Sequence, residues 1–502
     1  MKRRSWRTRH PADRWWLLAA GLLSALLGQA EEAPLADRIE AQEYPQALAL
    51  LESEININGQ QVDGMSALHW AVYYNQTALA LRLIERGADA TLTNRYGIAP
   101  LTLGCMNGNG NIVKALLVAG ADPNTSLNGG ETVLMTAART GDASAVNHLI
   151  AAGADLDAKE RNGQTAAMWA AAQGNLNVVE LLLSAGAEFD NQLKKSGFNP
   201  FFFSIREGRA EIVRRLLAAG SDVNSIMRPD NPKGKLPLRG TTPLLLAVEN
   251  GHYDLAVELL EAGADPNDNR SGYTVLHALT WIRKPDIGES SAGAPRPQGS
   301  GRRNSEQFVR ELVRHGANVN APLTRGRRAG RGRVSAVGAT PFFMAADRAD
   351  LAYMKLLVEL GADPFIPNED GTTALMVAAG IGSTAPEEEA GSESECLLAV
   401  QYLVSMGAEI NTVDANGETA MHGAAYKNLP TMVHYLNERG ADIALWNTKN
   451  KLGWTPLLIA EGYRPGNFKP SFVTADAITG VMRSHGVEPP KGPKPKHTNY
   501  AN

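Results

Sequence analysis

The sequence predicts an all-α solenoid, a stack of short helical repeats, and two observations lead to this fold class. Glycine accounts for 49 of the 502 residues while aromatic residues make up only 6%, and excess glycine in a folded chain indicates many turns. The tripeptide Gly-Ala-Asp or its near variant Gly-Ala-Glu begins at Gly87, Gly120, Gly153 and Gly186, and each start lies 33 residues after the one before. We therefore expect one repeated unit rather than about three globular domains.

The same glycine-containing tripeptide recurs toward the C-terminal end. Gly-Ala-Asp or a near variant also begins at Gly220, Gly263, Gly316, Gly361, Gly407 and Gly440. A second series of glycines, which runs from Gly64 to Gly453, opens each repeat. Behind these glycines stand related stretches such as Ser66-Ala67-Leu68-His69 and Thr242-Pro243-Leu244.

Each element of the repeat has a physical reason. A Thr before an apolar run caps a helix, and Pro in the first turn needs no donor. Small pairs such as Ala137-Ala138 let the first helix lie close to its neighbours, and the second helix carries an apolar stripe as at Val178 to Leu183. It ends at a glycine C-cap. One repeat cannot bury its apolar face alone, so stacking supplies the core.

These motifs resemble the ankyrin repeat, over residues 35–486 and with eleven opening glycines in phase. The resemblance implies about 11–12 repeats, each a helix-turn-helix with a β-hairpin finger. Ala36 to Leu51 is expected to form a degenerate N-terminal cap. The resemblance also implies a protein partner bound in the concave groove.

The N-terminus has the layout of a secretory signal peptide over residues 1–30. Basic residues precede the apolar run Trp15 to Leu27, and Gly28-Gln29-Ala30 forms a small-x-small cleavage site. The run is shorter than the ~20 residues that span a bilayer, so we expect cleavage near Ala30, no stable membrane insertion afterwards, and a periplasmic or secreted product. An uncleaved anchor is the alternative. The whole chain looks like an exported bacterial ankyrin-repeat protein.

Composition and residue spacing exclude several kinds of chemistry. The net charge of −4 and the pI near 6.2 are not those of a nucleic-acid-binding protein. Two cysteines rule out a disulfide-rich scaffold and cysteine-pair zinc sites, and Cys105 is expected to be an inert core thiol. His69, His277 and His422 share one position of the repeat, where a structural role is expected. No cofactor, metal site or catalytic residue is predicted.

Insertions interrupt the period in the C-terminal half. They fall near 225–238, 283–304, 321–337, 380–395 and 462–472, and residues 487–502 form a Pro/Lys tail that we expect to be disordered. The insertion at 321–337 is rich in Arg and the one at 380–395 is rich in Glu. Such insertions are either binding regions or solvated loops, which a chain tolerates at small entropic cost.

The resemblance places partner-binding residues after the opening glycine and at the end of the first helix. By phase these are Met65, Tyr73, Tyr74, Ile98, Met106, Arg139, Phe198, Arg206, Glu207, Tyr273, Trp281, Tyr426, Trp454 and Tyr463. Eight of the fourteen are aromatic, and Tyr, Trp, Met and Arg are enriched at interfaces. Trp70, Trp169, Phe201 and Phe203 fall at inward positions and are expected in the core.

The sequence therefore predicts a non-enzymatic, exported scaffold that binds another protein, as a monomer or in a hetero-complex. An accessory or assembly factor for an envelope enzyme is one such role. A secreted effector that acts on host or competitor proteins is an alternative. A ligand-binding or hydrolytic protein that uses the inserted loops is another.

Overall fold

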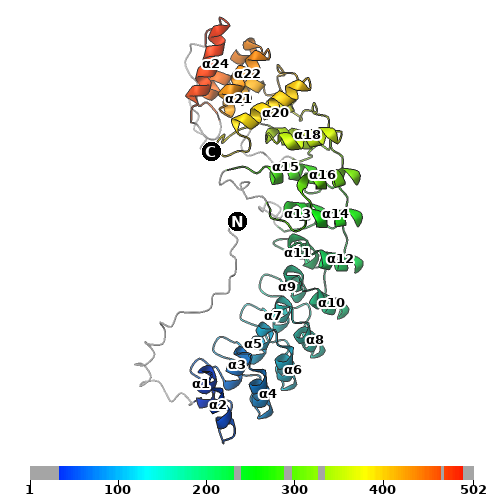
Figure 1. Cartoon of the computed structure of the whole chain (residues 1–502), viewed down its shortest axis with the longest axis vertical. Coiled ribbons are helices and arrows are strands. Elements are labelled where there is room, and N and C mark those ends of the chain that lie inside the picture. The colour runs from blue at the N-terminus through cyan, green and yellow to red at the C-terminus, as the bar shows by residue number, and fades with distance from the viewer. Residues whose placement is uncertain (1–32, 231–238, 288–296, 326–333, 465–468, 490–502) are drawn as a thin grey trace, which may run out of the picture. The chain divides into compact units, whose positions relative to one another are not determined.

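A computed structural model describes residues 33–230, 239–287, 297–325, 334–464 and 469–489. The chain divides into two compact units, unit 1 up to Ser221 and unit 2 from Asp222 (Figure 1). The predicted signal peptide and residues 490–502 of the tail lie outside the described residues, as do parts of four insertions.

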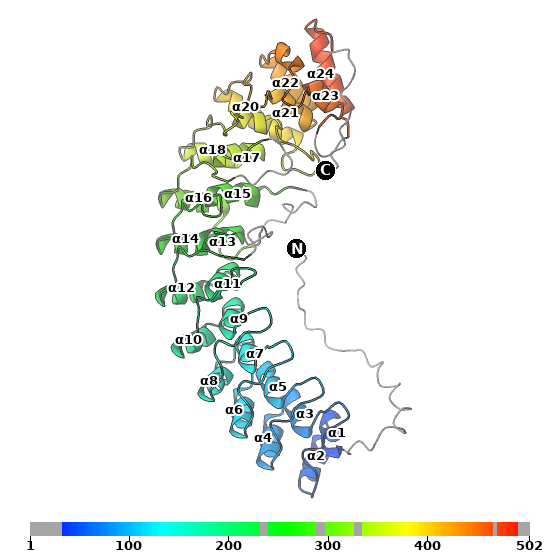
Figure 2. The same cartoon turned by 180° about the vertical axis from the view of Figure 1, so that it is seen from behind.

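Six pairs of helices lie among the described residues of unit 1, and the first pair is the predicted N-terminal cap. The helices are α1 (Pro34–Glu40), α2 (Tyr44–Leu51), α3 (Ala67–Tyr73), α4 (Thr77–Glu85), α5 (Pro100–Asn107), α6 (Gly110–Val118), α7 (Val133–Thr140), α8 (Ala143–Ala151), α9 (Ala166–Gln173), α10 (Leu176–Ser184), α11 (Pro200–Arg206) and α12 (Ala210–Ala218). The first helices of the pairs contact one another in an inner row, and the second helices from α4 to α12 form an outer row (Figures 1 and 2).

Unit 2 repeats this arrangement, with a short 3₁₀ helix near its end. Its described helices are α13 (Pro243–Glu249), α14 (Tyr253–Glu261), α15 (Val275–Arg283), α16 (Ser305–Arg314), α17 (Pro341–Asp347), α18 (Leu351–Glu359), α19 (Ala374–Ala378), α20 (Glu393–Ser405), α21 (Ala420–Tyr426), α22 (Pro430–Glu438), η3 (Ile443–Asn447), α23 (Pro456–Ala460) and α24 (Phe472–Ser484). The predicted all-α solenoid of stacked repeats is confirmed.

The helix boundaries follow from their end residues. The Thr132 hydroxyl accepts a 3.3 Å hydrogen bond from the backbone N–H of Met135 and so caps α7. The helix ends at Gly141, whose φ of 85° is left-handed and suits a residue without Cβ. Between these ends, Ala137 and Ala138 are fully buried. The small side chains allow α7 to pack against both α5 and α9.

The fingers between the helix pairs are turns rather than paired strands. No β-strand occurs among the described residues, and two fingers hold only an isolated antiparallel bridge, Gln60 to Ser66 and Ser126 to Thr132. The β-hairpin geometry implied by the resemblance is therefore reduced to these single bridges. Neighbouring fingers are joined through the backbone instead, as where the Arg95 N–H donates to the Asp63 carbonyl at 2.9 Å.

Asparagine side chains also join successive repeats. Asn124 accepts a 2.7 Å hydrogen bond from the backbone N–H of Asp155 and donates one of 3.4 Å to the carbonyl of Gly153. Asn58 makes the same pair of bonds two repeats earlier in unit 1, to Asp89 and Gly87. In unit 2, Asn224, Asn267, Asn320 and Asn411 repeat the pattern. We call these contacts the asparagine ladder.

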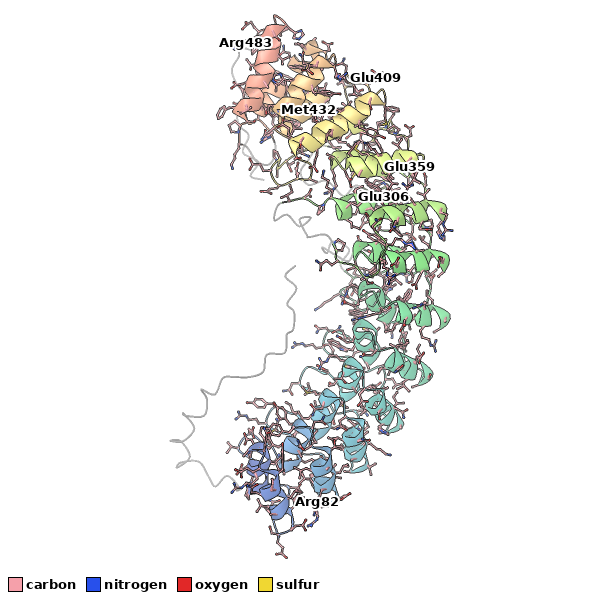
Figure 3. All side chains as sticks on the ribbon, in the orientation of Figure 1. Arg82, Glu306, Glu359, Glu409, Met432 and Arg483 are labelled. Carbon is pink, nitrogen blue, oxygen red and sulfur yellow. The ribbon has the colours of Figure 1, made fainter. Side chains whose placement is uncertain are left out.

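Ion pairs join the outer helices of unit 2 at the surface. Figure 3 shows Glu306 on α16 and Glu359 on α18, and Arg310 pairs with both, at 3.4 Å and 2.6 Å respectively. All three side chains are well exposed. Exposed pairs of this kind contribute at most about 1 kcal/mol, so the buried apolar face of each helix provides most of the stability.

Candidate protein-interaction face

The three repeat histidines have structural partners. In each, Nδ1 lies close to the side-chain oxygen of the helix-capping residue, at 2.8 Å from Ser66 for His69 and 2.9 Å from Thr274 for His277. The Nε2 atoms of His69 and His277 form hydrogen bonds with the carbonyls of Ile98 and Ala339 in the next finger. This confirms the expected structural use at these two positions.

The third histidine keeps only part of this arrangement. Nδ1 of His422 lies 3.0 Å from the Thr419 hydroxyl, but Nε2 has no hydrogen-bond partner among the described residues. Burial lowers the pKa of both His277 and His422 to about 4, which keeps the rings neutral.

An aromatic cluster stands at the end of α3 in unit 1. The ring of Trp70 stacks on Tyr74 with centroids 5.7 Å apart and meets the edge of Tyr73 at 5.6 Å. The indole N–H donates to Gln61 at 2.6 Å, and the Tyr74 hydroxyl donates to the Glu40 carbonyl at 3.1 Å. These contacts hold the cluster in place while Tyr73 stays 50% exposed.

The next repeats continue this surface. Met106 occupies the Tyr73 position on α5 and is 52% exposed. Arg139 occupies it on α7, where its guanidinium pairs with Glu131 at 3.0 Å and lies 5.4 Å from the ring of Trp169. The Trp169 indole N–H is shielded from solvent and has no hydrogen-bond partner among the described residues. We call Trp70, Tyr73, Tyr74, Met106, Arg139 and Trp169 the inner-helix face.

A cation also covers aromatic rings at the end of α11. The Arg206 guanidinium lies 4.9 Å from the ring centroids of both Phe198 and Phe203, and its Nε bonds Glu207 at 2.8 Å. Both phenylalanines are buried, as is Phe201. Phe201 and Phe203 thus confirm the expected core positions, and Arg206 and Glu207 are the solvent-facing members of this group.

In unit 2 the predicted positions are mostly enclosed. Tyr273 meets Trp281 edge-on at 4.9 Å and donates to Glu249 at 2.8 Å. The Tyr426 hydroxyl donates to the buried carboxylate of Glu418 at 2.8 Å and accepts from Asn450 at 3.0 Å. Buried polar groups that are hydrogen-bonded in this way are typical of structural cores.

The fourteen predicted binding residues therefore divide by exposure. Those on the surface are Tyr73, Met106 and Glu207; those half-buried are Tyr74, Ile98, Arg139, Arg206, Trp281 and Tyr463; those buried are Met65, Phe198, Tyr273, Tyr426 and Trp454. Burial removes most of the last five side chains from reach of a partner that binds without rearrangement. Their role in binding, like that of the others, stays a prediction.

Two residues that we expected in the core lie nearer the surface. Trp70 and Trp169 are half-buried, not enclosed. The first belongs to the aromatic cluster at the end of the short helix α3, and the second lies against Arg139 of the preceding repeat. Both expectations were wrong, because each indole keeps part of its surface exposed to solvent.

The Glu-rich insertion at 380–395 is ordered, and its carboxylates accept hydrogen bonds from other groups of the chain. Glu389 accepts hydrogen bonds from the backbone N–H groups of Thr384 and Ala385, at 2.8 Å and 3.0 Å. Ile381 and Ala390 are buried. Among the described residues, no group of three or more His, Cys, Asp or Glu side chains could hold a metal ion.

Both cysteines are free and buried, Cys105 in unit 1 and Cys396 in unit 2. Burial raises the pKa of both thiols, which suppresses the reactive thiolate. In the part of the chain that the structure describes, no helix has both the length and the apolar character needed to cross a membrane.

Helix pairs that bury one face and present aromatic and cationic side chains on another define a repeat scaffold for protein interaction. Sequence comparison agrees with this class. Ankyrin-repeat families match residues 39–127, 134–227, 239–270 and 389–436, which together make up more than half of the chain. The chain therefore belongs to the ankyrin repeat family.

Individual relatives match over shorter lengths. Alpha-latrotoxin-Lhe1a of Latrodectus hesperus is 41% identical over 63 residues, 12% of this chain and 4% of the toxin. Ankyrin repeat and SOCS box protein 6 of Pongo abelii is 26% identical over 194 residues, 36% of this chain and 40% of the relative. The matches thus span far less than two thirds of either protein.

A solved structure is similar at lower identity. The human ASB11 ankyrin repeat domain is 21% identical, with a TM-score of 0.39, and the comparison covers 51% of this chain and 99% of that domain.

Proposed function

We propose that this chain is an exported scaffold that binds a partner protein on the inner-helix face of unit 1. One observation carries the proposal: Tyr73, Met106 and Arg139 occupy the same position of three successive repeats, where Tyr73 and Met106 are exposed and Arg139 is half-buried. Tyr, Met and Arg are enriched at interface centres. Ring contacts with Trp70 and Tyr74 hold Tyr73 beforehand, and the ion pair with Glu131 holds Arg139, which reduces the entropy lost on binding.

Affinity capture with the tagged full-length chain in its native cells tests this function. Tyr73→Ala combined with Met106→Ala should reduce the recovered partner at least fivefold, because exposed aromatic and Met contacts dominate binding energy. Trp281→Ala tests the same position in unit 2. Far-UV circular dichroism checks that each variant is folded.

Val118→Ala provides the matched control. Val118 is an 82% exposed apolar residue at the end of the outer helix α6, so its truncation removes surface of similar character away from the inner-helix face. Capture that survives the double variant and is lost with Val118→Ala would place the interface on the outer helices instead.

Export is part of the proposal and rests on the basic and apolar residues before Ala30. N-terminal sequencing of the protein from its native cells should begin at or near Glu31. A chain that still begins at Met1 would contradict export through this signal.

The cell fraction then separates two roles. A partner recovered with the protein from the envelope supports an accessory or assembly factor. Recovery from the culture medium alone supports an effector that acts on host or competitor proteins.

A further inference from the structure

Two insertions of unit 2 contact each other across an intervening repeat. We call residues 284–287, which follow α15, together with residues 380–395, which follow α19 and include the first turn of α20, the brace. In an ordinary repeat stack each repeat contacts only its neighbours. The brace links the repeat of α15 and α16 to that of α19 and α20, and the repeat of α17 and α18 lies between them.

Three interactions span the intervening repeat. The backbone N–H of Ile287 donates to the carbonyl of Glu388 at 2.8 Å. The backbone N–H of Ala390 donates to Oδ1 of Asp286 at 3.1 Å. The Lys284 ammonium pairs with Glu395 at 2.8 Å. Two of the three are bonds to backbone groups, so they hold the path of the insertion as well as its side chains.

The intervening repeat is bonded into the brace by its own helix-to-helix turn. The Arg348 guanidinium donates to the Lys284 carbonyl at 2.7 Å and to Asp286 at 3.2 Å. Lys284 donates to the Ala349 carbonyl at 2.9 Å, and Arg283 pairs with Asp350 at 3.0 Å. These charged side chains are largely shielded from water, where hydrogen bonds are stronger than at an exposed edge.

The far end of the brace is fixed to the repeat of α21 and α22. The buried Lys427 donates to the Ala390 carbonyl at 2.6 Å, and Glu393 accepts from the backbone N–H of Thr431 at 2.7 Å. Gly380 permits this approach: a Cβ there would lie 2.6 Å from the Gly423 carbonyl oxygen.

We propose that the brace makes the repeats from α15 to α20 open and close as one cooperative block. With neighbour contacts alone, the repeat of α15 could separate from the following repeat at the cost of one interface. With the brace, the same opening also breaks the bonds to residues 388–395. Bending at the intervening repeat would stretch the same bonds, so the brace also limits flexing of this part of unit 2.

Native-state hydrogen exchange of the full chain over a urea series tests the proposal, because it measures local opening free energies. In the wild type, peptides from α15, α17 and α19 should share one opening free energy. Asp286→Ala should separate them, with α15 amides exchanging at least tenfold faster than those of α19. Asp286→Asn keeps an Oδ1 acceptor for Ala390 and should behave like the wild type.

Asp254→Ala is the matched control. Asp254 also accepts a backbone N–H from an inserted segment, that of Arg302 at 2.6 Å, and pairs with Arg303 at 3.4 Å, but it links adjacent repeats only. The variant should leave α15, α17 and α19 exchanging together.

If Asp286→Ala does not fold, Lys284→Met provides the test instead, because it removes only the contacts of the Lys284 ammonium with Glu395 and Ala349. Separate opening of the three helices in the wild type, or joint opening in Asp286→Ala or in Lys284→Met, would overturn the proposal.

Discussion

The carboxylate of Asp286 accepts a hydrogen bond from the backbone N–H of Ala390, 104 residues further along the chain. The same oxygen accepts from Arg348. One side chain thus joins three successive repeats through residues that are far apart in the sequence. Asp286 also acts electrostatically on Asp347, whose carboxyl has a raised pKa, and the titration of Asp347 makes the region sensitive to pH.

Asp347→Asn should stabilise unit 2 above about pH 6. Removal from water raises the pKa of the Asp347 carboxyl from 3.8 to about 6; Arg348 and Lys427 oppose the rise, and Glu389 and Asp286 add to it. The folded state therefore holds a proton that the unfolded state has lost between these values, and the free energy of unfolding falls as pH rises through this window. The variant should gain about 1–3 kcal/mol over the wild type at pH 7.

Urea unfolding at pH 4, 5, 6 and 7 measures this difference. The gap between variant and wild type should widen up to about pH 6 and stay constant above it. A gap that is independent of pH would contradict the raised pKa of Asp347.

His277→Gln should give the opposite dependence on pH. Burial lowers the pKa of His277 from 6.5 to about 4, so the wild type loses stability as pH falls through this window, where only the unfolded state takes up the proton. At pH 7 the variant should be less stable by about 1–3 kcal/mol, because it loses bonds to Thr274 and Ala339. Its deficit should shrink at pH 5.

Urea midpoints at pH 5 and pH 7 check this, with His485→Gln as the control on an exposed histidine. The control should shift neither midpoint by much. A deficit of His277→Gln that grows on acidification would show that the buried ring is protonated in the folded state.

Neither native cysteine should react with an aromatic disulfide reagent while the chain is folded. Cys105 and Cys396 are buried and burial raises the pKa of both thiols, so little thiolate forms and the reagent has no access. Absorbance of the released thiolate should report no thiol in buffer and two in urea. Val118→Cys at an 82% exposed position should add one rapidly reacting thiol; rapid reaction of the unmodified chain would mean that a core helix opens readily.

Asn124→Ala should destabilise unit 1 by about 0.5–1.5 kcal/mol, the usual net value of intramolecular hydrogen bonds. Asn124→Asp should cost less, since it keeps the acceptor for Asp155 and loses only the donor to Gly153. The chain itself carries such a residue: Asp157 accepts from the Glu188 N–H at 2.8 Å. Thermal unfolding ranks the variants, and Asn128→Ala at an exposed finger position should be neutral. Equal effects at Asn124 and Asn128 would mean that the asparagine ladder does not add to stability.

The repeat architecture was predictable because its signals are local. Each helix start, turn and end depends on a Thr, Pro or Gly within a few residues, as at Thr132 and Gly141, and the period of 33 makes these signals reinforce one another. That the described fingers hold no β-strand was not predictable from the repeat motif, because the motif specifies the turn residues and not how far the chain pairs across the turn, as at the single bridge from Ser126 to Thr132.

The candidate site was less predictable, because exposure depends on residues from other repeats. Tyr426 shares the phase of Tyr73, but Glu418 and Asn450 bond its hydroxyl and it is buried. The Glu-rich composition of 380–395 is as typical of a solvated loop as of a binding region. Hydrogen bonds with Asp286 and Lys427 order this segment. Both residues lie far from it in the sequence, and the local residue pattern does not indicate either contact.

The asparagine ladder has a consequence for how such a chain can change in length. Asn124 bonds only backbone atoms of the following repeat, the Gly153 carbonyl and the Asp155 N–H, and so do its counterparts in unit 2. The contact therefore accepts any following repeat that keeps the same turn, whatever side chains it carries. Gene duplication could insert or remove a repeat here without a matching change in its neighbour, whereas the same event inside the brace would leave Asp286 and Ala390 out of reach of each other.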